Sequence, residues 1–254
     1  MAIGVQAPRG SPTSGFRNPI RPCPAVRIPS VKNMEITACD LVLPCRDEGP
    51  ALRALLAEVP PGFSVIVVDN GSRDDTAEVA ERHGARIVRE PRPGYGAAVH
   101  AGVEAATAEF VAVMDGDGSF DPAELAPLLR AVTEGDVDLA LGRRRPVSRG
   151  VWPWHARAGN AVVVRLLRRS GFAAHDLAPM RVCRRADLVG LDVRDRRFGY
   201  PLEAVLRAAD AGWRIVEVDV SYHPRTGRSK VTGTVRGTLA AVRDMRRALA
   251  DVRA

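Results

Sequence analysis

The feature that most constrains the fold is an alternation of short apolar runs with helical stretches along most of the 254-residue chain. The apolar runs predict strands at residues 38–43, 64–69, 85–89, 110–115 and 137–141. The stretches between them predict helices at residues 50–59, 74–83, 95–106 and 122–133. This order is typical of an α/β fold in which helices cover both faces of a mainly parallel sheet.

The remaining sequence divides the chain into three parts. Residues 1–33 are rich in proline, serine, glycine and arginine, which is typical of a disordered leader, and we expect Met34 to be the true start. Residues 34–230 form the α/β domain, which is completed by helices at 156–169 and 200–211 and a strand at 213–222. Residues 231–254 predict a basic amphipathic helix.

Composition excludes several classes of protein. The net charge of +7 is concentrated at the two ends: residues 1–33 contain five basic residues and no acid, and residues 222–254 contain eight basic and two acidic residues. Because the body between them is acidic on balance and no nucleic-acid motif is present, we expect no nucleic-acid partner. The four cysteines lack metal-ligand spacing, so we expect reduced thiols in a cytoplasmic protein. No stretch reaches the roughly 18 to 20 apolar residues that a membrane-spanning helix requires.

Two carboxylates follow the strand predicted at residues 110–115. Asp115 and Asp117 are separated by one glycine. In open α/β sheets, ligands bind outside the carboxyl ends of the strands. Two acids at such a place provide the hard oxygen ligands that suit Mg²⁺ or Mn²⁺, although Asp-Gly pairs are also common in solvated turns.

The neighbouring acid, Asp121, has a structural explanation. A calcium-binding loop that begins at Asp115 would need glycine and glutamate where Phe120 and Ala126 stand, so that site is excluded. Asp121 precedes a proline and has Glu124 three residues later, which is typical of a helix N-cap. We therefore predict that Asp121 caps a helix.

Polar residues also follow the first two predicted strands. Pro44 ends the first strand, because it cannot donate a hydrogen bond to a neighbouring strand. Asp69 lies at the tip of the second strand, where it can accept hydrogen bonds from a base or a ribose. Asn70 and Gly71 predict a tight turn, and Asp74 or Asp75 then caps the next helix.

Residues 92–102 form a glycine-rich segment. Gly94 and Gly96 are similar to the start of a dinucleotide-binding fingerprint, but Val99 stands where its third glycine belongs. The glycines either let the backbone approach a ligand or form the turn that enters a helix, and the sequence leaves both interpretations open.

Together, these segments resemble the family 2 glycosyltransferases, which have the GT-A fold. The resemblance extends over residues 40–231 and rests on four motifs in order: 44–48, 68–74, 94–102 and the Asp-x-Asp of Asp115 and Asp117. Asp47 and Asn70 depart from the family pattern, in which asparagine and aspartate are usual at these positions.

The resemblance implies a nucleotide-diphospho-sugar donor and a bound divalent metal. Asp115 and Asp117 would hold Mg²⁺ or Mn²⁺ on the donor diphosphate, and Asp117 is also the first catalytic candidate. The implied donor-binding residues are Pro44, Arg46, Glu48, Asp69, Gly94, Asp115, Arg228, Ser229 and Lys230.

The second half of the chain is most similar to the branch of dolichyl- or polyprenyl-phosphate sugar synthases. Residues 175–181 match a motif of that branch, with Pro179 and Met180 as departures. Residues 225–230 match its Arg-x-Gly-x-Ser-Lys loop, whose arginine and lysine side chains complement phosphate oxygens. The structural alternative for the loop is a solvated basic turn.

Asp176 and Arg181 complete the catalytic candidates. With a hydroxyl acceptor, Asp176 would act as the general base. With a phosphate acceptor no strong base is needed, and Asp176 could instead orient the acceptor, help to bind the metal or cap a turn. Arg181 suits an anionic acceptor.

The predicted C-terminal helix also concerns the acceptor. Its apolar positions recur at three- and four-residue steps and are flanked by arginines. Such a helix either lies on an anionic membrane surface or packs on the domain or a partner.

We therefore expect a metal-dependent enzyme that transfers a hexose, with inversion, to a polyprenyl-phosphate-type acceptor in the cytoplasm, with possible contact to the inner face of the membrane. The alternatives are a transferase of the same family with a hydroxyl acceptor, a sugar-phosphate nucleotidylyltransferase, and a non-catalytic sugar-nucleotide-binding protein. Only Arg46 and Gly49 represent the basic, glycine-rich loop of a nucleotidylyltransferase, which argues against that class.

Overall fold

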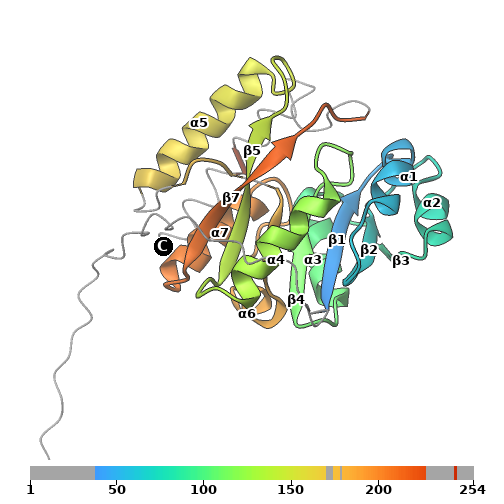
Figure 1. Ribbon diagram of the computed structural model, residues 1–254, viewed down its shortest axis with the longest axis horizontal. Coiled ribbons are helices and arrows are strands. Elements are labelled where there is room, and N and C mark those ends of the chain that lie inside the picture. Colours follow the sequence, from blue (N-terminus) through green and yellow to red (C-terminus); the bar gives the residue numbers. More distant parts are fainter. Residues whose placement is uncertain (1–37, 170–173, 178, 227–242, 245–254) are drawn as a thin grey trace, which may run out of the picture.

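The computed structural model describes residues 38–169, 174–177, 179–226 and 243–244. It contains a seven-stranded sheet with the order β3-β2-β1-β4-β6-β5-β7, flanked by helices (Figure 1). The strands are β1 Cys39–Cys45, β2 Phe63–Asp69, β3 Arg86–Arg89, β4 Phe110–Val113, β5 Leu139–Pro146, β6 Arg181–Arg184 and β7 Ile215–Tyr222. The α-helices are α1 Gly49–Ala57, α2 Thr76–Arg82, α3 Tyr95–Ala105, α4 Leu125–Thr133, α5 Trp154–Arg169, α6 Arg185–Gly190 and α7 Tyr200–Asp210.

The sheet is mainly parallel, as predicted. Strands β3, β2, β1 and β4 are parallel neighbours, and β5 is parallel to β7. The exception is β6, which lies antiparallel between β4 and β5. The sequence analysis predicted neither β6 nor α6, because both are short and lie outside the regular alternation of strands and helices.

The helices cover both faces of the sheet, and β1 shows how the sequence specifies this. Val42 packs into one core with side chains of α3, α5, α6 and α7. Its neighbours Leu41 and Leu43 point to the opposite face, into a core with side chains of α1, α2 and α4. Both faces are therefore apolar, as expected of a parallel strand in the middle of an α/β sheet.

Several boundaries differ from the sequence-based predictions. The strand predicted at 137–141 extends to Pro146. The helix predicted at 122–133 begins with a 3₁₀ turn, η1 (Pro122–Glu124), before α4. The leader, and all of the predicted C-terminal helix except residues 243–244, lie outside the described residues.

In the described part of the chain, no helix has the length and apolar character needed to cross a membrane.

Candidate functional site

Asp115 and Asp117 follow β4 at the carboxyl end of the parallel strands. After β4, the Met114 amide still donates to Val42 of β1, and the chain then turns past the end of that strand. Gly116 lies so close to β1 that a Cβ atom there would be 2.4 Å from the sulfur of Cys45. The glycine between the two acids is therefore required by packing.

Asp115 carries a buried polar atom that is unusual in a folded protein. Its Oδ1 atom is buried and has no hydrogen-bond partner among the described residues. Burial raises the pKa of Asp115, and the neighbouring Arg225 and Arg144 act in the opposite direction. The hydroxyl group of Tyr95 lies beside this carboxylate and also lowers the pKa of Asp115, while burial raises the pKa of Tyr95 itself.

Asp117 is only 3% exposed and is held by its own loop and by the segment after β7. Its Oδ1 atom accepts a hydrogen bond from the Ser119 amide at 2.9 Å. Its Oδ2 atom pairs with the guanidinium of Arg225, and its backbone carbonyl accepts from the Thr226 amide at 2.9 Å. Residues 225 and 226 therefore lie directly on the Asp-x-Asp turn.

These two acids fit a partial set of metal ligands. A buried carboxylate oxygen with no hydrogen-bond partner is costly unless a cation binds to it, and Asp115 presents such an atom. In the described parts of the chain, no group of three or more histidine, cysteine or acidic side chains could hold a metal ion. Mg²⁺ usually takes its remaining ligands from water and from substrate phosphates.

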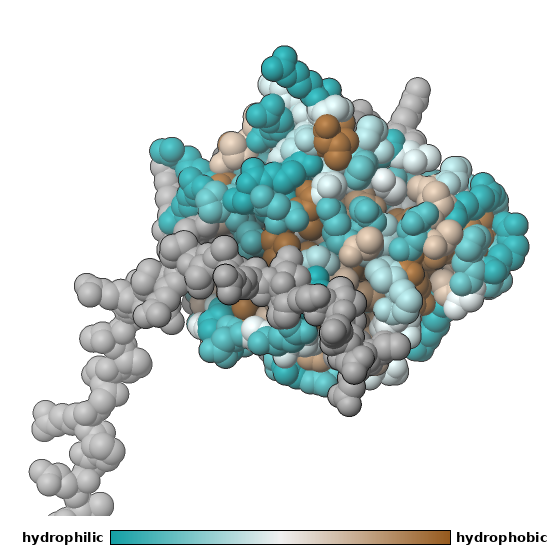
Figure 2. Space-filling model, in the orientation of Figure 1, coloured by the Kyte–Doolittle hydropathy of each residue, from teal (hydrophilic) through white to brown (hydrophobic). Residues whose placement is uncertain are grey.

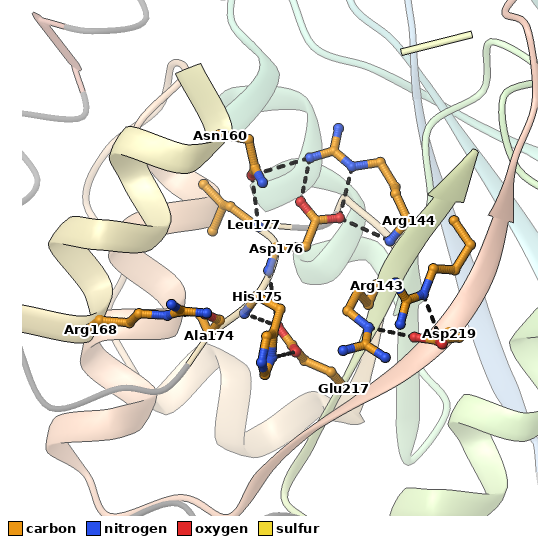
Figure 3. A network of polar contacts seen from close by, with 11 residues as sticks. Arg143, Arg144, Asn160, Arg168, Ala174, His175, Asp176, Leu177, Glu217 and Asp219 are labelled. Atoms are coloured by element: carbon orange, nitrogen blue, oxygen red, sulfur yellow. Dashed lines mark hydrogen bonds and ion pairs between the residues drawn. The ribbon is translucent and has the colours of Figure 1, made fainter. Parts of the chain in front are cut away.

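Asp176 lies on the other side of this site and is fully engaged with Arg144 of β5. Figure 3 shows both oxygens of the carboxylate directed at Arg144. The distances are 2.9 Å from Nε to Oδ2 and 2.6 Å from Nη2 to Oδ1, and the Arg144 amide also donates to Oδ2 at 3.0 Å. Asp176 raises the pKa of Arg144 against the effect of burial. This buried, bidentate pair fixes the position of the Asp176 carboxyl group.

A second layer of polar contacts fixes the pair (Figure 3). Asn160 of α5 accepts hydrogen bonds from Arg144 Nη2 at 3.4 Å and from the Leu177 amide at 3.1 Å. Glu217 of β7 accepts from the amides of His175 and Asp176. The segment that carries Asp176 is therefore tied to β5, α5 and β7.

An aromatic cluster lies beside Arg144. The guanidinium carbon is 4.2 Å from the centre of the Trp152 ring and 5.6 Å from that of Tyr222. Tyr222 also contacts Phe120, in the loop after Asp117, with ring centres 5.5 Å apart. These rings form an apolar wall next to the three carboxylates, with one cation fixed against it.

Arg181 is the first residue of β6 and is buried. The register pairs it with Val113 on one side and Leu141 on the other, so β6 begins where β4 ends. The positive charge of Arg181 favours the ionised form of Asp115. The structure therefore brings the three catalytic candidates Asp117, Asp176 and Arg181 to one region, around Asp115.

The predicted donor-binding residues of β1 and β2 are also neighbours. The register pairs Cys45 with Asp69, so Pro44 and Asp69 lie at adjacent strand ends. Asp69 accepts a hydrogen bond from the Ser72 amide at 2.8 Å, which shapes the turn after β2. Arg46 is exposed and Glu48 is half-buried.

The two departures from the family pattern both have structural roles. Asn70 donates to the carbonyls of Glu90 and Arg92 and accepts from the Gly94 amide, all within 2.9 Å. It thereby fixes the glycine-rich segment to the end of β2. Asp47 accepts from the Arg73 amide at 2.7 Å and so joins the loops after β1 and β2.

Gly94 and Gly96 are explained by close packing against residues 195–200. A Cβ atom on Gly94 would be 2.2 Å from the Arg196 carbonyl oxygen, and one on Gly96 would clash with Tyr200. The amides of Gly96 and Ala97 donate to the carbonyls of Arg197 and Arg196. These two amides of the first turn of α3 are therefore already hydrogen-bonded within the protein. That Gly94 contacts the donor stays a prediction.

The helix caps are partly as predicted. Asp121 accepts from the Ala123 amide at 2.8 Å and caps η1, which confirms its structural role. Asp74 accepts from the amides of Thr76 and Gly49 and so connects α2 to the start of α1. Asp75 occupies the N-cap position of α2 but makes no capping hydrogen bond there, and its side chain pairs with Arg53.

Arg228, Ser229 and Lys230 lie outside the described residues, so their predicted donor contacts are not tested.

The sequence analysis did not identify Arg144 and Trp152 as residues of the site. The available signal was the arginine run at residues 143–145 at the end of a predicted strand, which is the kind of place where ligands bind.

Comparison with known proteins agrees with the fold and the motifs. The family model described as glycosyl transferase family 2 matches residues 40–186. An uncharacterized glycosyltransferase of Mycobacterium bovis is 56% identical over 209 residues, which cover 82% of this chain and 95% of that protein. A dolichyl-phosphate hexose transferase of Haloferax volcanii is 31% identical over 204 residues, covering 78% and 89%.

Solved structures show the same fold. The glucosyl-3-phosphoglycerate synthase of Mycobacterium tuberculosis, in complex with Mn²⁺, uridine diphosphate and glucosyl-3-phosphoglycerate, superposes with a TM-score of 0.68 at 21% identity. The match covers 85% of this chain and 80% of that chain. This likeness confirms the expected GT-A architecture.

Proposed function

The chain belongs to glycosyl transferase family 2, and from that premise we propose that it transfers a hexose from a nucleotide-diphospho-sugar to a polyprenyl-phosphate-type acceptor. A relative with a dolichyl-phosphate acceptor in its name supports this acceptor class. The observation that carries the proposal is the buried Oδ1 atom of Asp115, without a partner in the described residues, beside Asp117 at the carboxyl end of β4.

The donor side follows from these two acids. We propose that Asp115 and Asp117 hold Mg²⁺ or Mn²⁺, as a structural neighbour crystallised with Mn²⁺ and uridine diphosphate suggests. The cation would supply Lewis-acid stabilisation for the charge that develops on the leaving diphosphate. Pro44, Arg46, Glu48 and Asp69 would surround the nucleoside at the adjacent ends of β1 and β2.

The acceptor side favours a phosphate over a hydroxyl group. A hydroxyl nucleophile needs a base, but both oxygens of Asp176 accept hydrogen bonds from Arg144. A phosphate nucleophile is already ionised at neutral pH and needs no base. Arg181, buried beside Asp115, supplies positive charge for such an acceptor.

The test is transfer from labelled nucleotide-sugars to a short-chain prenyl phosphate in the presence of Mn²⁺. The donor is chosen first by thermal shift, because a bound donor stabilises the fold by mass action. We expect Asp117→Asn to lower transfer by at least about 10²-fold. An equal rate in this variant, or transfer to a simple alcohol but not to the phosphate, would contradict the proposal. No transfer with any donor would favour a non-catalytic binding protein.

A further inference from the structure

Helix α5 presents an exposed surface that is both apolar and basic. In the described part of the chain, the large hydrophobic side chains that are exposed are Val147, Trp154, Val162 and Val189. Trp154 and Val162 belong to α5 and are 79% and 60% exposed, and Val147 precedes the helix with 50% exposure. Contiguous apolar patches on a surface mark contact sites, and two of these four side chains belong to one helix.

Helix α5 itself also carries positive charge and no acidic residue. The α5 sequence contains four arginines, one histidine and no aspartate or glutamate. Six of the exposed positions of α5 recur at three- and four-residue steps and so share one side of the helix: 154, 157, 158, 161, 162 and 165. We call the exposed side chains of Trp154, Arg157, Val162 and Arg165 the α5 face.

The opposite side of α5 reaches the candidate site. Val163, Val164 and Leu167 are buried against the domain. Asn160 accepts hydrogen bonds from Arg144 and from the Leu177 amide, next to Asp176 (Figure 3). Helix α5 therefore lies between a molecule that contacts the α5 face and the acceptor side of the site.

We propose that the α5 face docks on an anionic lipid surface and brings the acceptor side of the site to that surface. This inference rests on the proposed function, because a polyprenyl phosphate resides in a membrane with its phosphate at the interface. It concerns a different segment from the C-terminal helix predicted at residues 231–254.

The chemistry of the face selects this partner. Arginine attracts anionic headgroups, and its aliphatic stem can lie along apolar surface. Tryptophan prefers the boundary between headgroups and acyl chains, where one side of the ring is apolar and the other is wet. Figure 2 shows the side of the molecule in view as mostly hydrophilic, with apolar groups in separate spots.

Co-sedimentation of the full chain with vesicles tests the proposal. We expect binding to vesicles of phosphatidylglycerol and phosphatidylcholine, and much weaker binding to phosphatidylcholine alone. Val162→Glu should lower the partition coefficient by about tenfold, because it places an anion in the apolar part of the α5 face. Val189→Glu, at the exposed valine of α6, is the matched control and should bind as the unchanged chain does.

Fluorescence supplies a second readout that does not depend on the variant's stability. The chain has three tryptophans, and insertion of Trp154 should shift its emission to the blue when anionic vesicles are added. Trp154→Phe should lose most of this shift while its vesicle binding falls by a few-fold at most.

The outcomes separate this inference from the proposed function. Val162→Glu should still transfer sugar to a short-chain prenyl phosphate in detergent, where no membrane is needed. No transfer by any form, with vesicle binding intact, would reject the proposed function alone. Equal vesicle binding by Val162→Glu and Val189→Glu, or no binding by the unchanged chain, would overturn the docking role. A dimer that Val162→Glu converts to a monomer would show instead that the face joins two copies of the chain.

Discussion

Gly116 is the residue that brings Asp115 and Asp117 close to β1. Its backbone passes the end of β1 so closely that a side-chain carbon would be 2.4 Å from the Cys45 sulfur. Gly116 and Cys45 are both buried in the packed interior, where neighbouring atoms cannot shift without strain. The close packing of Gly116 against Cys45 therefore fixes where the two carboxylates lie relative to β1.

We predict that Gly116→Ala lowers the free energy of unfolding by about 1–3 kcal/mol, because the added methyl group overpacks this contact. The loss is measured by urea denaturation. Adding Cys45→Ala to the Gly116→Ala chain removes the sulfur atom that the new methyl group meets. The double variant should therefore recover part of the lost stability, since the two changes share one contact. Gly159→Ala is the control: a Cβ atom there meets nothing within 4 Å, so stability should be unchanged or slightly higher. Additive losses in the double variant would contradict the packing explanation.

Single residues also show the limit of sequence reasoning. The cap at Asp121 was predictable because capping depends on neighbours three residues away. The role of Asn70 was not, because its partners Glu90, Arg92 and Gly94 become neighbours only when β3 pairs with β2. An aspartate at position 70 could not donate to two carbonyls, so the departure from the family pattern has a structural cause.

At the scale of elements, the parallel half of the sheet was predictable and the antiparallel part was not. Strands β1, β2 and β4 are apolar runs, β3 contains an Ile-Val pair, and helices separate all four; this alternation is a local property of the sequence. Strand β6 is short and lies between β4 and β5, so its existence depends on two distant partners. For the same reason, the pair of Arg144 and Asp176 was not predicted.

That pair connects β5 to the segment 174–177, and we predict strong energetic coupling between its members. Asp176→Asn and Arg144→Gln should each destabilise the protein by about 3 kcal/mol, because each leaves a buried charge without its partner. The double variant should lose much less than the sum. A double-mutant cycle in urea measures this, with Arg145 and Asp219, an exposed pair on β5 and β7, as the weakly coupled control.

The segment after β7 leads to a prediction about the cation site. The Arg225 guanidinium pairs with Asp117 and so places a positive charge where a metal ion would bind. We expect Arg225→Ala to bind Mn²⁺ about tenfold more tightly in the absence of nucleotide, because the competing cation is gone. Electron paramagnetic resonance of unbound Mn²⁺ measures the affinity without any turnover. Arg145→Ala, which removes an arginine paired with Asp219, is the control. Weaker binding in Arg225→Ala would mean that this arginine supports the site.

At the scale of the whole molecule, β4 divides the sheet into two sides with different chemistry. On one side, β1 and β2 end in the proposed nucleoside-binding residues Pro44 and Asp69. On the other side, β5 and β6 carry Arg144 and Arg181, beside the aromatic wall. Asp115 lies between them, so a donor and an acceptor that approach from opposite sides would meet at its carboxylate.

This arrangement predicts which parts of the chain a donor fragment will protect. A nucleoside diphosphate with Mn²⁺ should slow amide hydrogen exchange at residues 43–48, 69–72 and 114–119, where the ends of β1, β2 and β4 meet. Residues 174–177 should keep their exchange rates, because Glu217 and Asn160 hold them independently of the donor side. Adding a short-chain prenyl phosphate should then slow exchange at 174–177 as well. Protection of 174–177 by the nucleotide alone would place the donor on the acceptor side and reverse the proposed assignment of the two halves.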